Sequence, residues 1–325
     1  MVAKAGTLYI IPTGALYTLP FETLFLSESP GTQGPHYLVQ DHSIAYLSSA
    51  SLLKTLREAG TRKKEKAPYP LLAFANPVYA RAIQDASSEA PPCPPPSDKT
   101  PVTGGTSSIS SMRGRAYLDI MGGSFRELPD TEEEAREIKA IFEAPDKSRP
   151  LQLREAASRS NVLGLNEEKK LKDYRFILFS CHGIAPDEVD PLMQPALVLS
   201  LPDPKTGKEE YLTMADALGL KLNADLVTLS ACNTGRGKVQ KGEGVMGLTR
   251  AFMYAGTPAI SVTLWSVESG SARTLSTGLF SGLKEGKGRA QALRDIKLSM
   301  LRGEKGDLYR HPFFWAPVVL FGDGK

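Results

Sequence analysis

The 325-residue chain contains few cysteines and no long apolar run. Its three cysteines, at positions 93, 181 and 232, form an odd set without paired spacing, which argues against a disulfide framework or a structural zinc site. No stretch of about 18 consecutive apolar residues is present, and the first residues lack the basic, apolar and small-residue succession of a signal peptide. We therefore expect a cytoplasmic protein without a membrane segment, in which at least one thiol is free to react.

The chain also lacks a strong excess of either charge. It has 39 Lys and Arg residues against 36 Asp and Glu residues, a net charge of +3. No block of like charge stands out beyond Arg62-Lys63-Lys64, so direct binding to nucleic acid is not expected. No G-x-x-x-x-G-K-[ST] loop follows a predicted strand, which argues against a nucleotide hydrolase. The 41% of hydrophobic residues is typical of a folded globular protein.

A change of composition divides the chain. Residues 85–115 are rich in Pro, Ser, Gly and Thr, including the sequence PPCPPP at 91–96, and cannot bury enough apolar surface to offset their ordering entropy. We predict a disordered loop there, between a strand-rich part at 1–84 and a second part at 116–325. A strand is predicted almost at the first residue, at 7–12, so we expect the chain to be the C-terminal piece of a longer protein.

From residue 131 onward, amphipathic segments alternate with short apolar runs. This order predicts an α/β fold whose central, mostly parallel sheet has helices on both faces. The helix predicted at 131–142 is expected to begin with a capping box formed by Thr131 and Glu134. The predicted helices span 49–56, 131–142, 156–165, 213–220, 244–254, 271–283 and 289–301, and the further strands span 37–40, 43–47, 71–75, 174–180, 196–201, 226–231, 259–265 and 316–321.

Two of the predicted strands end in a reactive side chain that is followed by small residues. The strand at 174–180 leads to His182 and Gly183, and the strand at 226–231 leads to Cys232, 50 residues after the histidine. In a parallel sheet both groups emerge at the same edge, where an imidazole can activate a thiol as a nucleophile. The amides of Gly183 and Cys232 could then form an oxyanion hole. The alternative from these residues alone is a small buried cysteine and a histidine satisfied by a turn.

Several motifs together resemble the CHAT family of caspase-like cysteine peptidases, in the clan with caspases, separases and gingipains. The resemblance covers nearly the whole chain. Its motifs are SCHG at 180–183, LSACNTG at 229–235, GEGVMGLTRAF at 242–252, AG at 255–256, SVTLWSV at 261–267 and HPFFWA at 311–316, with looser matches of PTGAL at 12–16 and LPFE at 19–22.

The resemblance implies a caspase/separase-like three-layer sandwich, with residues 116–325 as the catalytic domain and 1–84 as a pseudo-protease-like N-terminal part of the CHAT region. It implies a thiol protease with His182 as the general base and Cys232 as the nucleophile, and no metal or organic cofactor. CHAT domains commonly follow tetratricopeptide (TPR) repeats, and bacterial members resemble proteases switched on in antiviral defence. The implied partners are a protein substrate, an N-terminal TPR or other sensor region, and an activating complex.

The substrate-binding residues are less well marked. Candidates are Ser230, two residues before the nucleophile, Asp187 after the histidine, and the cleft-wall residues Thr263, Trp265, Ser266 and Val267. Metacaspase-type relatives carry an acidic residue at the position of Ser230, so no strict preference for a basic P1 residue is predicted. Cys181 would point to the opposite face of its strand from His182 and is expected to pack in the core.

A competing hypothesis from another functional class is a catalytically silent CHAT-like module that binds a partner protein. Such a module would keep the CHAT fold but would not cleave peptide bonds. The presence of both His182 and Cys232 favours the enzyme.

Overall fold

A computed structural model describes residues 6–28, 35–62, 67–79, 125–142, 149–184, 194–230, 247–265 and 268–325. The predicted loop at 85–115, with Cys93, lies outside these described residues. So do four of the candidate site residues, Asp187, Cys232, Ser266 and Val267. No helix in the described ranges is long and apolar enough to cross a membrane.

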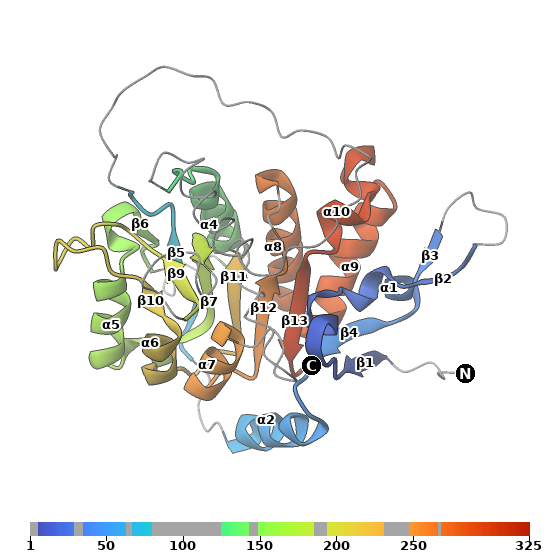
Figure 1. Cartoon of the computed structure of the whole chain (residues 1–325), viewed down its shortest axis with the longest axis horizontal. Coiled ribbons are helices and arrows are strands. Elements are labelled where there is room, and N and C mark those ends of the chain that lie inside the picture. The colour runs from blue at the N-terminus through green and yellow to red at the C-terminus, as the bar shows by residue number, and fades with distance from the viewer. Residues whose placement is uncertain are drawn as a thin grey trace, which may run out of the picture.

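The centre of the fold is one eight-stranded sheet (Figure 1). All neighbouring strands are parallel except for one antiparallel pair, β12 with β13. The predicted α/β fold with a mostly parallel sheet is therefore confirmed. Across the sheet the strands are β1 (Thr7–Ile10), β4 (Ser43–Tyr46), β13 (Val318–Gly322), β12 (Ala259–Thr263), β11 (Leu226–Ser230), β7 (Tyr174–Ser180), β5 (Tyr69–Ala75) and β6 (Gln152–Leu153).

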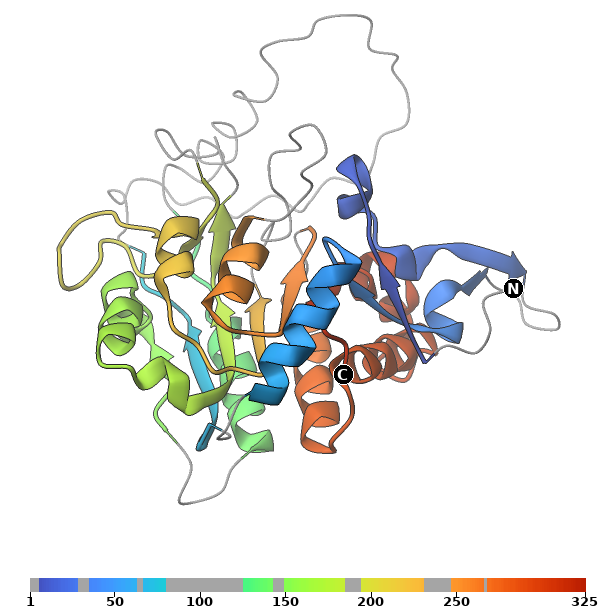
Figure 2. The ribbon, with the colours of Figure 1, turned by 90° about the horizontal axis from the view of Figure 1, so that it is seen from below.

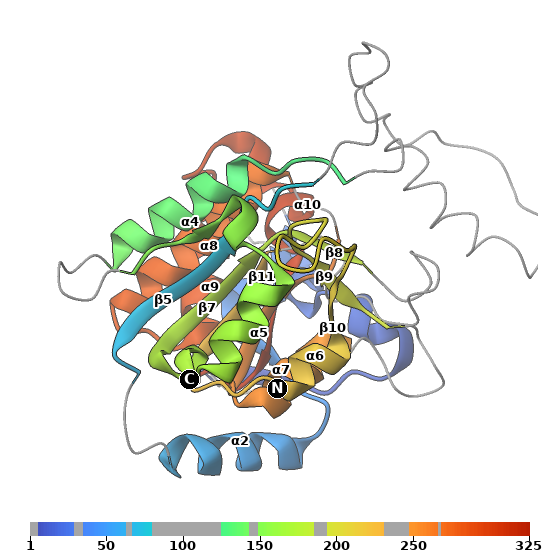
Figure 3. The same ribbon diagram turned by 90° about the vertical axis from the view of Figure 1, so that its left-hand side faces the viewer.

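Helices cover both faces of this sheet, as Figure 3 shows. One face carries α4 (Asp130–Ile141), α8 (Ser269–Lys284) and α9 (Arg289–Leu301), and the other carries α5 (Arg159–Glu167), α6 (Met214–Gly219) and α7 (Gly247–Ala255). Side chains of a strand alternate between the faces, so Phe176 and Leu178 of β7 join one core and Ile177 and Phe179 the other. Burial on both faces explains why the strands read as continuous apolar runs.

The remaining elements lie around this sandwich. Seen from below (Figure 2), the N-terminal strand β1 lies at the same end of the molecule as the C-terminal helices. The elements outside the sandwich are of three kinds. They are a hairpin of β2 (Phe25–Glu28) and β3 (Pro35–Tyr37), the helices α1 (Leu38–Asp41), α2 (Ala50–Arg62) and α10 (Pro312–Trp315), and a small antiparallel sheet of β8 (His182–Ile184), β9 (Ala196–Val198) and β10 (Leu212–Thr213).

Two local predictions are wrong. The predicted strand at 37–40 is largely helix α1, because the Gln40 side chain accepts a hydrogen bond from the Tyr37 amide (2.7 Å) and so caps a helical turn. The predicted capping box at the start of α4 does not form. Helix α4 begins at Asp130 without a side-chain cap, and the Thr131 hydroxyl instead binds the Leu128 carbonyl and the Asn76 amide. Glu134, the expected capping partner, is buried.

A buried ion pair ties the N-terminal part of the chain to helix α9. The ammonium of Lys297 lies 2.8 Å from Glu22 Oε1, and the hydroxyl of Tyr46 in β4 donates to Glu22 Oε2 (2.5 Å). Both charged side chains are almost fully buried. Burial lowers the pKa of Lys297, and the carboxylate of Glu22 opposes that effect. A pair of this kind is held by mutual attraction that must offset two desolvation costs.

Removing one partner of this pair should destabilise the fold. We expect Lys297→Met to lower the free energy of unfolding by about 3–5 kcal/mol, because Glu22 then stays buried without its cation. The double variant Glu22→Leu with Lys297→Met should recover much of that loss. Lys54→Met, at the exposed pair with Glu58, is the control and should change stability by less than about 0.5 kcal/mol. Urea unfolding measures all four proteins, and equal effects of Lys297→Met and Lys54→Met would contradict this account.

Candidate active site

The predicted base and nucleophile follow two neighbouring strands. Strands β7 and β11 pair in parallel register, with Ser180 opposite Ser230. His182 follows Ser180 by two residues, and Cys232 follows Ser230 by two residues. The structure thus describes His182 and the strand that leads to the predicted nucleophile, while Cys232 itself lies outside the described residues.

The ring of His182 is held in a small aromatic box. It is 7% exposed and lies against Tyr79 and Phe125, with ring centroids 5.4 and 5.5 Å away. Its Nε2 lies 2.8 Å from the backbone carbonyl oxygen of Arg126. A carbonyl can only accept, so Nε2 carries the proton of this hydrogen bond and Nδ1 is the basic nitrogen of the neutral ring.

Burial sets the charge of this imidazole. Desolvation lowers the pKa of His182 below its usual value, although the hydrogen bond to Arg126 acts in the opposite direction. The ring is therefore neutral near pH 7. A neutral imidazole with a free lone pair on Nδ1 can take a proton from a thiol and later return it to a leaving amine.

The small sheet holds the backbone on either side of this ring. Strand β8 pairs with β9, so His182 lies opposite Val198 and Gly183 opposite Leu197. The hydroxyl of Tyr79 donates to the Val198 carbonyl (3.0 Å), which joins the aromatic box to the same ladder. Gly183, the predicted oxyanion-hole residue, is half-buried in β8.

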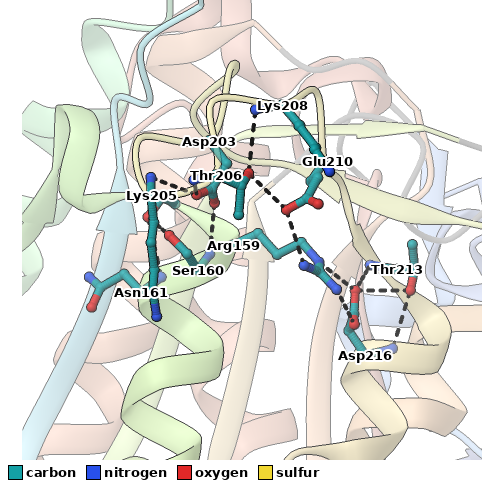
Figure 4. Close-up of polar contacts among 11 residues, drawn as sticks. Arg159, Ser160, Asn161, Asp203, Lys205, Thr206, Lys208, Glu210, Thr213 and Asp216 are labelled. Atoms are coloured by element: carbon teal, nitrogen blue, oxygen red, sulfur yellow. Dashed lines mark hydrogen bonds and ion pairs between the residues drawn. The ribbon is translucent and has the colours of Figure 1, made fainter.

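A cluster of polar residues anchors this sheet to the helices below it (Figure 4). Arg159 of α5 makes two hydrogen bonds to Asp216 of α6, at 3.0 and 2.8 Å, and lies 3.4 Å from Glu210. Asp216 also accepts from the Thr213 amide (3.0 Å), which links α6 to β10. Burial alone would raise the pKa of Asp216, but Arg159 and Thr213 outweigh it and the pKa is lowered. Asp203 accepts from the Ser160 amide (2.8 Å) and so joins the β9–β10 connection to α5.

A cavity opens at the carboxyl ends of β7, β11 and β12. It contains about 530 Å³ of empty space, part of it continuous with solvent. Among the predicted site residues, it brings together His182, Ser230 and Thr263. Its described lining residues are Leu128, Asp130, Thr131, Glu134, Cys181, His182, Ser230, Thr263, Ser269 and Ala272.

The sequence also singles out Trp265 and Cys181, of which Cys181 is among the described lining residues of the cavity. The indole of Trp265 donates to the Phe313 carbonyl (3.2 Å) and packs against both hydrophobic cores, and Trp265 is not among those lining residues. Cys181 is 2% exposed and its side chain belongs to the core on the α5–α7 face, as predicted.

Sequence reasoning missed Tyr79, Phe125 and Glu134. Tyr79 and Phe125 are more than 50 residues from His182 along the chain, and no local pattern joins them to it. Glu134 did leave a signal, because it lies one helical turn before the buried Ile138 and thus on the inward face of α4. Among the described residues, no group of His, Cys, Asp and Glu could hold a metal ion.

Comparison with known proteins decides the family. The model of the CHAT domain matches residues 2–323 of the chain. The chain belongs to the CHAT domain family. The tetratricopeptide repeat protein 28 of Mus musculus is 33% identical over 125 residues, covering 38% of this chain and 5% of that protein. Its Homo sapiens counterpart is 33% identical over 115 residues, covering 35% of this chain and 4% of that protein.

The CHAT chain thus spans about one twentieth of the length of these curated relatives. Among solved structures, the Arg-specific cysteine proteinase gingipain R aligns with a TM-score of 0.46 at 11% identity, covering 87% of this chain and 55% of that one.

The Arg159 cluster should stabilise the small sheet of the CHAT domain. Arg159→Ala removes two hydrogen bonds to a half-buried carboxylate, and we expect a loss of about 1–2 kcal/mol in the free energy of unfolding together with faster amide exchange in β9 and β10. Arg136→Ala, which breaks an exposed pair with Glu132, is the matched control and should cost less than about 0.5 kcal/mol. Unchanged exchange in β9 and β10 would contradict this anchoring role.

The pKa of His182 should lie below the usual value of about 6.5 in a nuclear magnetic resonance titration, with the signal assigned by its loss in His182→Ala. Phe125→Ala should raise that pKa, because it exposes the ring to water. The unfolded chain binds the proton of this imidazole more readily than the folded chain does. The contribution of neutral His182 to the free energy of unfolding is therefore present above about pH 6.5 and is lost as the pH falls through the folded-state pKa. A pKa above the usual value in the unmodified chain would refute the buried, neutral base.

Proposed function

We propose that this CHAT domain is a cysteine endopeptidase with a dyad of His182 and Cys232. The observation that carries the proposal is the register of β7 and β11, which aligns the strands preceding the two residues. Cys232 is two residues beyond Ser230, and two peptide units span at most about 7 Å. This short separation along the chain supports a thiol within reach of His182.

The proposed reaction has two halves. Nδ1 of His182 accepts the thiol proton as the sulfur of Cys232 attacks the carbonyl carbon of the scissile peptide. The amides of Gly183 and Cys232 would stabilise the oxyanion of the tetrahedral intermediate. The protonated ring then donates to the leaving amine, which departs and leaves a thioester. In the second half His182 takes a proton from water, the hydroxide attacks the thioester, and the carboxylic acid product leaves as the thiol is restored.

Further assignments belong to the same proposal. Residues 116–325 would form the catalytic domain, and Ser230, Thr263, Trp265, Ser266, Val267 and Asp187 would contact the substrate. By its family resemblance, the domain would follow a TPR or other sensor region and be activated by a partner complex in a cytoplasmic defence or signalling pathway. The likeness of part of the chain to tetratricopeptide repeat protein 28 supports a TPR-associated context.

Covalent labelling tests the dyad. A peptide carrying a thiol-reactive acyloxymethyl ketone should label Cys232, and mass spectrometry of a digest should locate the adduct. We expect His182→Ala to slow labelling by about 10²–10⁴-fold, because the thiol loses its base. Cys93→Ala removes a cysteine of the Pro-rich stretch at 85–115 and should leave the rate within about twofold of the unmodified protein, a difference of less than about 0.5 kcal/mol.

Labelling of Cys232 at the same rate with and without His182 would refute the dyad. No labelling of Cys232, even in the presence of the activating partner, would favour a silent interaction module instead.

A further inference from the structure

Glu134 is a buried carboxylate in the wall of the cavity beside His182. It lies on the inward face of α4 and is 2% exposed. Its Oε2 accepts a short hydrogen bond from the Ser180 hydroxyl. Its other oxygen, Oε1, is buried and has no hydrogen-bond donor among the described residues. A buried acceptor without a donor is destabilising, so a ligand that donates a hydrogen bond to this oxygen would remove an energetic cost.

The described lining of the cavity has acidic side chains but no lysine or arginine. The two acidic residues are Asp130 and Glu134. Arg273 on the adjacent helix α8 is engaged outside it, in ion pairs with Glu133 and Glu137. A cation of a bound molecule would complement these carboxyl groups.

The pKa of Glu134 reflects the same burial of its carboxyl group. Burial raises the pKa of Glu134, although hydroxyls of Ser180, Ser276 and Ser230 oppose that rise. The Ser276 and Ser230 hydroxyls lie near the carboxylate, but neither makes a hydrogen bond with Oε1. A bound cation would favour the charged carboxylate and supply the missing donor at once.

We propose that this cavity is the S1 pocket of the peptidase and that Glu134 selects an arginine or lysine side chain at P1. The assignment rests on the proposed function, since it takes His182 as the base beside the scissile bond. Ser230 and His182 both line the cavity, so a substrate whose scissile carbonyl lies at the sheet edge can direct its P1 side chain toward α4.

The remaining walls suit a long basic side chain. Leu128 and Ala272 are apolar lining residues that can pack against its methylene groups, and Thr263 and Ser269 line the same space. The acidic group comes from helix α4 and not from the position two residues before the nucleophile. A serine at 230 is therefore compatible with a basic P1 residue, which the sequence alone did not predict.

Three probes that differ only at P1 test this specificity. They carry arginine, citrulline or leucine in otherwise identical peptidyl acyloxymethyl ketones. Citrulline keeps the shape of arginine but replaces one guanidinium nitrogen with a urea oxygen and removes the charge. We expect the arginine probe to label Cys232 about 10- to 100-fold faster than the citrulline probe, the range expected from a charge-assisted hydrogen bond.

The Glu134→Gln variant should lose this preference, so that the arginine and citrulline probes label it at similar rates. Glu137→Gln changes a half-exposed carboxylate on the same helix, outside the described lining of the cavity, and should keep the full preference. Equal labelling by the arginine and citrulline probes, or a preference that survives Glu134→Gln, would overturn the S1 assignment and leave the dyad intact.

A binding measurement separates the pocket from the catalysis. Calorimetry on the Cys232→Ala chain should show n-butylguanidinium binding at least tenfold more tightly than n-butylurea, with the difference lost in Glu134→Gln. Equal affinities would overturn the cation site whatever the probes show. If no probe labels Cys232, the peptidase and its S1 assignment both fail, even where n-butylguanidinium binds selectively.

Discussion

The parallel pairing of β7 with β11 is the constraint on which the candidate site depends. With Ser180 opposite Ser230, both strands end at the same edge of the sheet. A slip of one residue would turn every side chain of a strand to the other face. The two cores hold the register, because alternate residues of both strands are buried on opposite faces.

At that edge the apolar strands are followed by polar side chains that are buried or enclosed by other residues. Ser180, Ser230 and Glu134 meet on the α4–α8 side, and His182 is enclosed by two aromatic rings. Polar groups in such surroundings are costly unless they are satisfied, and the Oε1 atom of Glu134 has no hydrogen-bond donor within the described ranges. Violations of the rules for stable packing concentrate at functional sites. The carboxyl edge of this sheet fits that pattern.

The sequence predicted the sandwich because its strands are buried on both faces and read as continuous apolar runs, as at 174–180 and 226–231. It also located His182 at the edge of the sheet, because a histidine two residues after such a strand is conspicuous. It failed where contacts distant in sequence decide the outcome. Glu134 fits a capping box by local spacing, but Thr131 is drawn to the Leu128 carbonyl and the Asn76 amide, and the glutamate turns inward. The aromatic box around His182 joins segments that no periodicity connects.

The central claim is that a neutral His182 serves as the base for Cys232, and the pH dependence of Cys232 alkylation tests it most directly. The rate constant for a small alkylating reagent should be measured from pH 5 to pH 10 in the unmodified chain and in His182→Ala. The account predicts that alkylation in the unmodified chain persists to low pH and falls with an apparent pKa below about 6.5, whereas His182→Ala follows a lone thiol with a pKa near about 8.5. A single profile near that higher value in both proteins would contradict it.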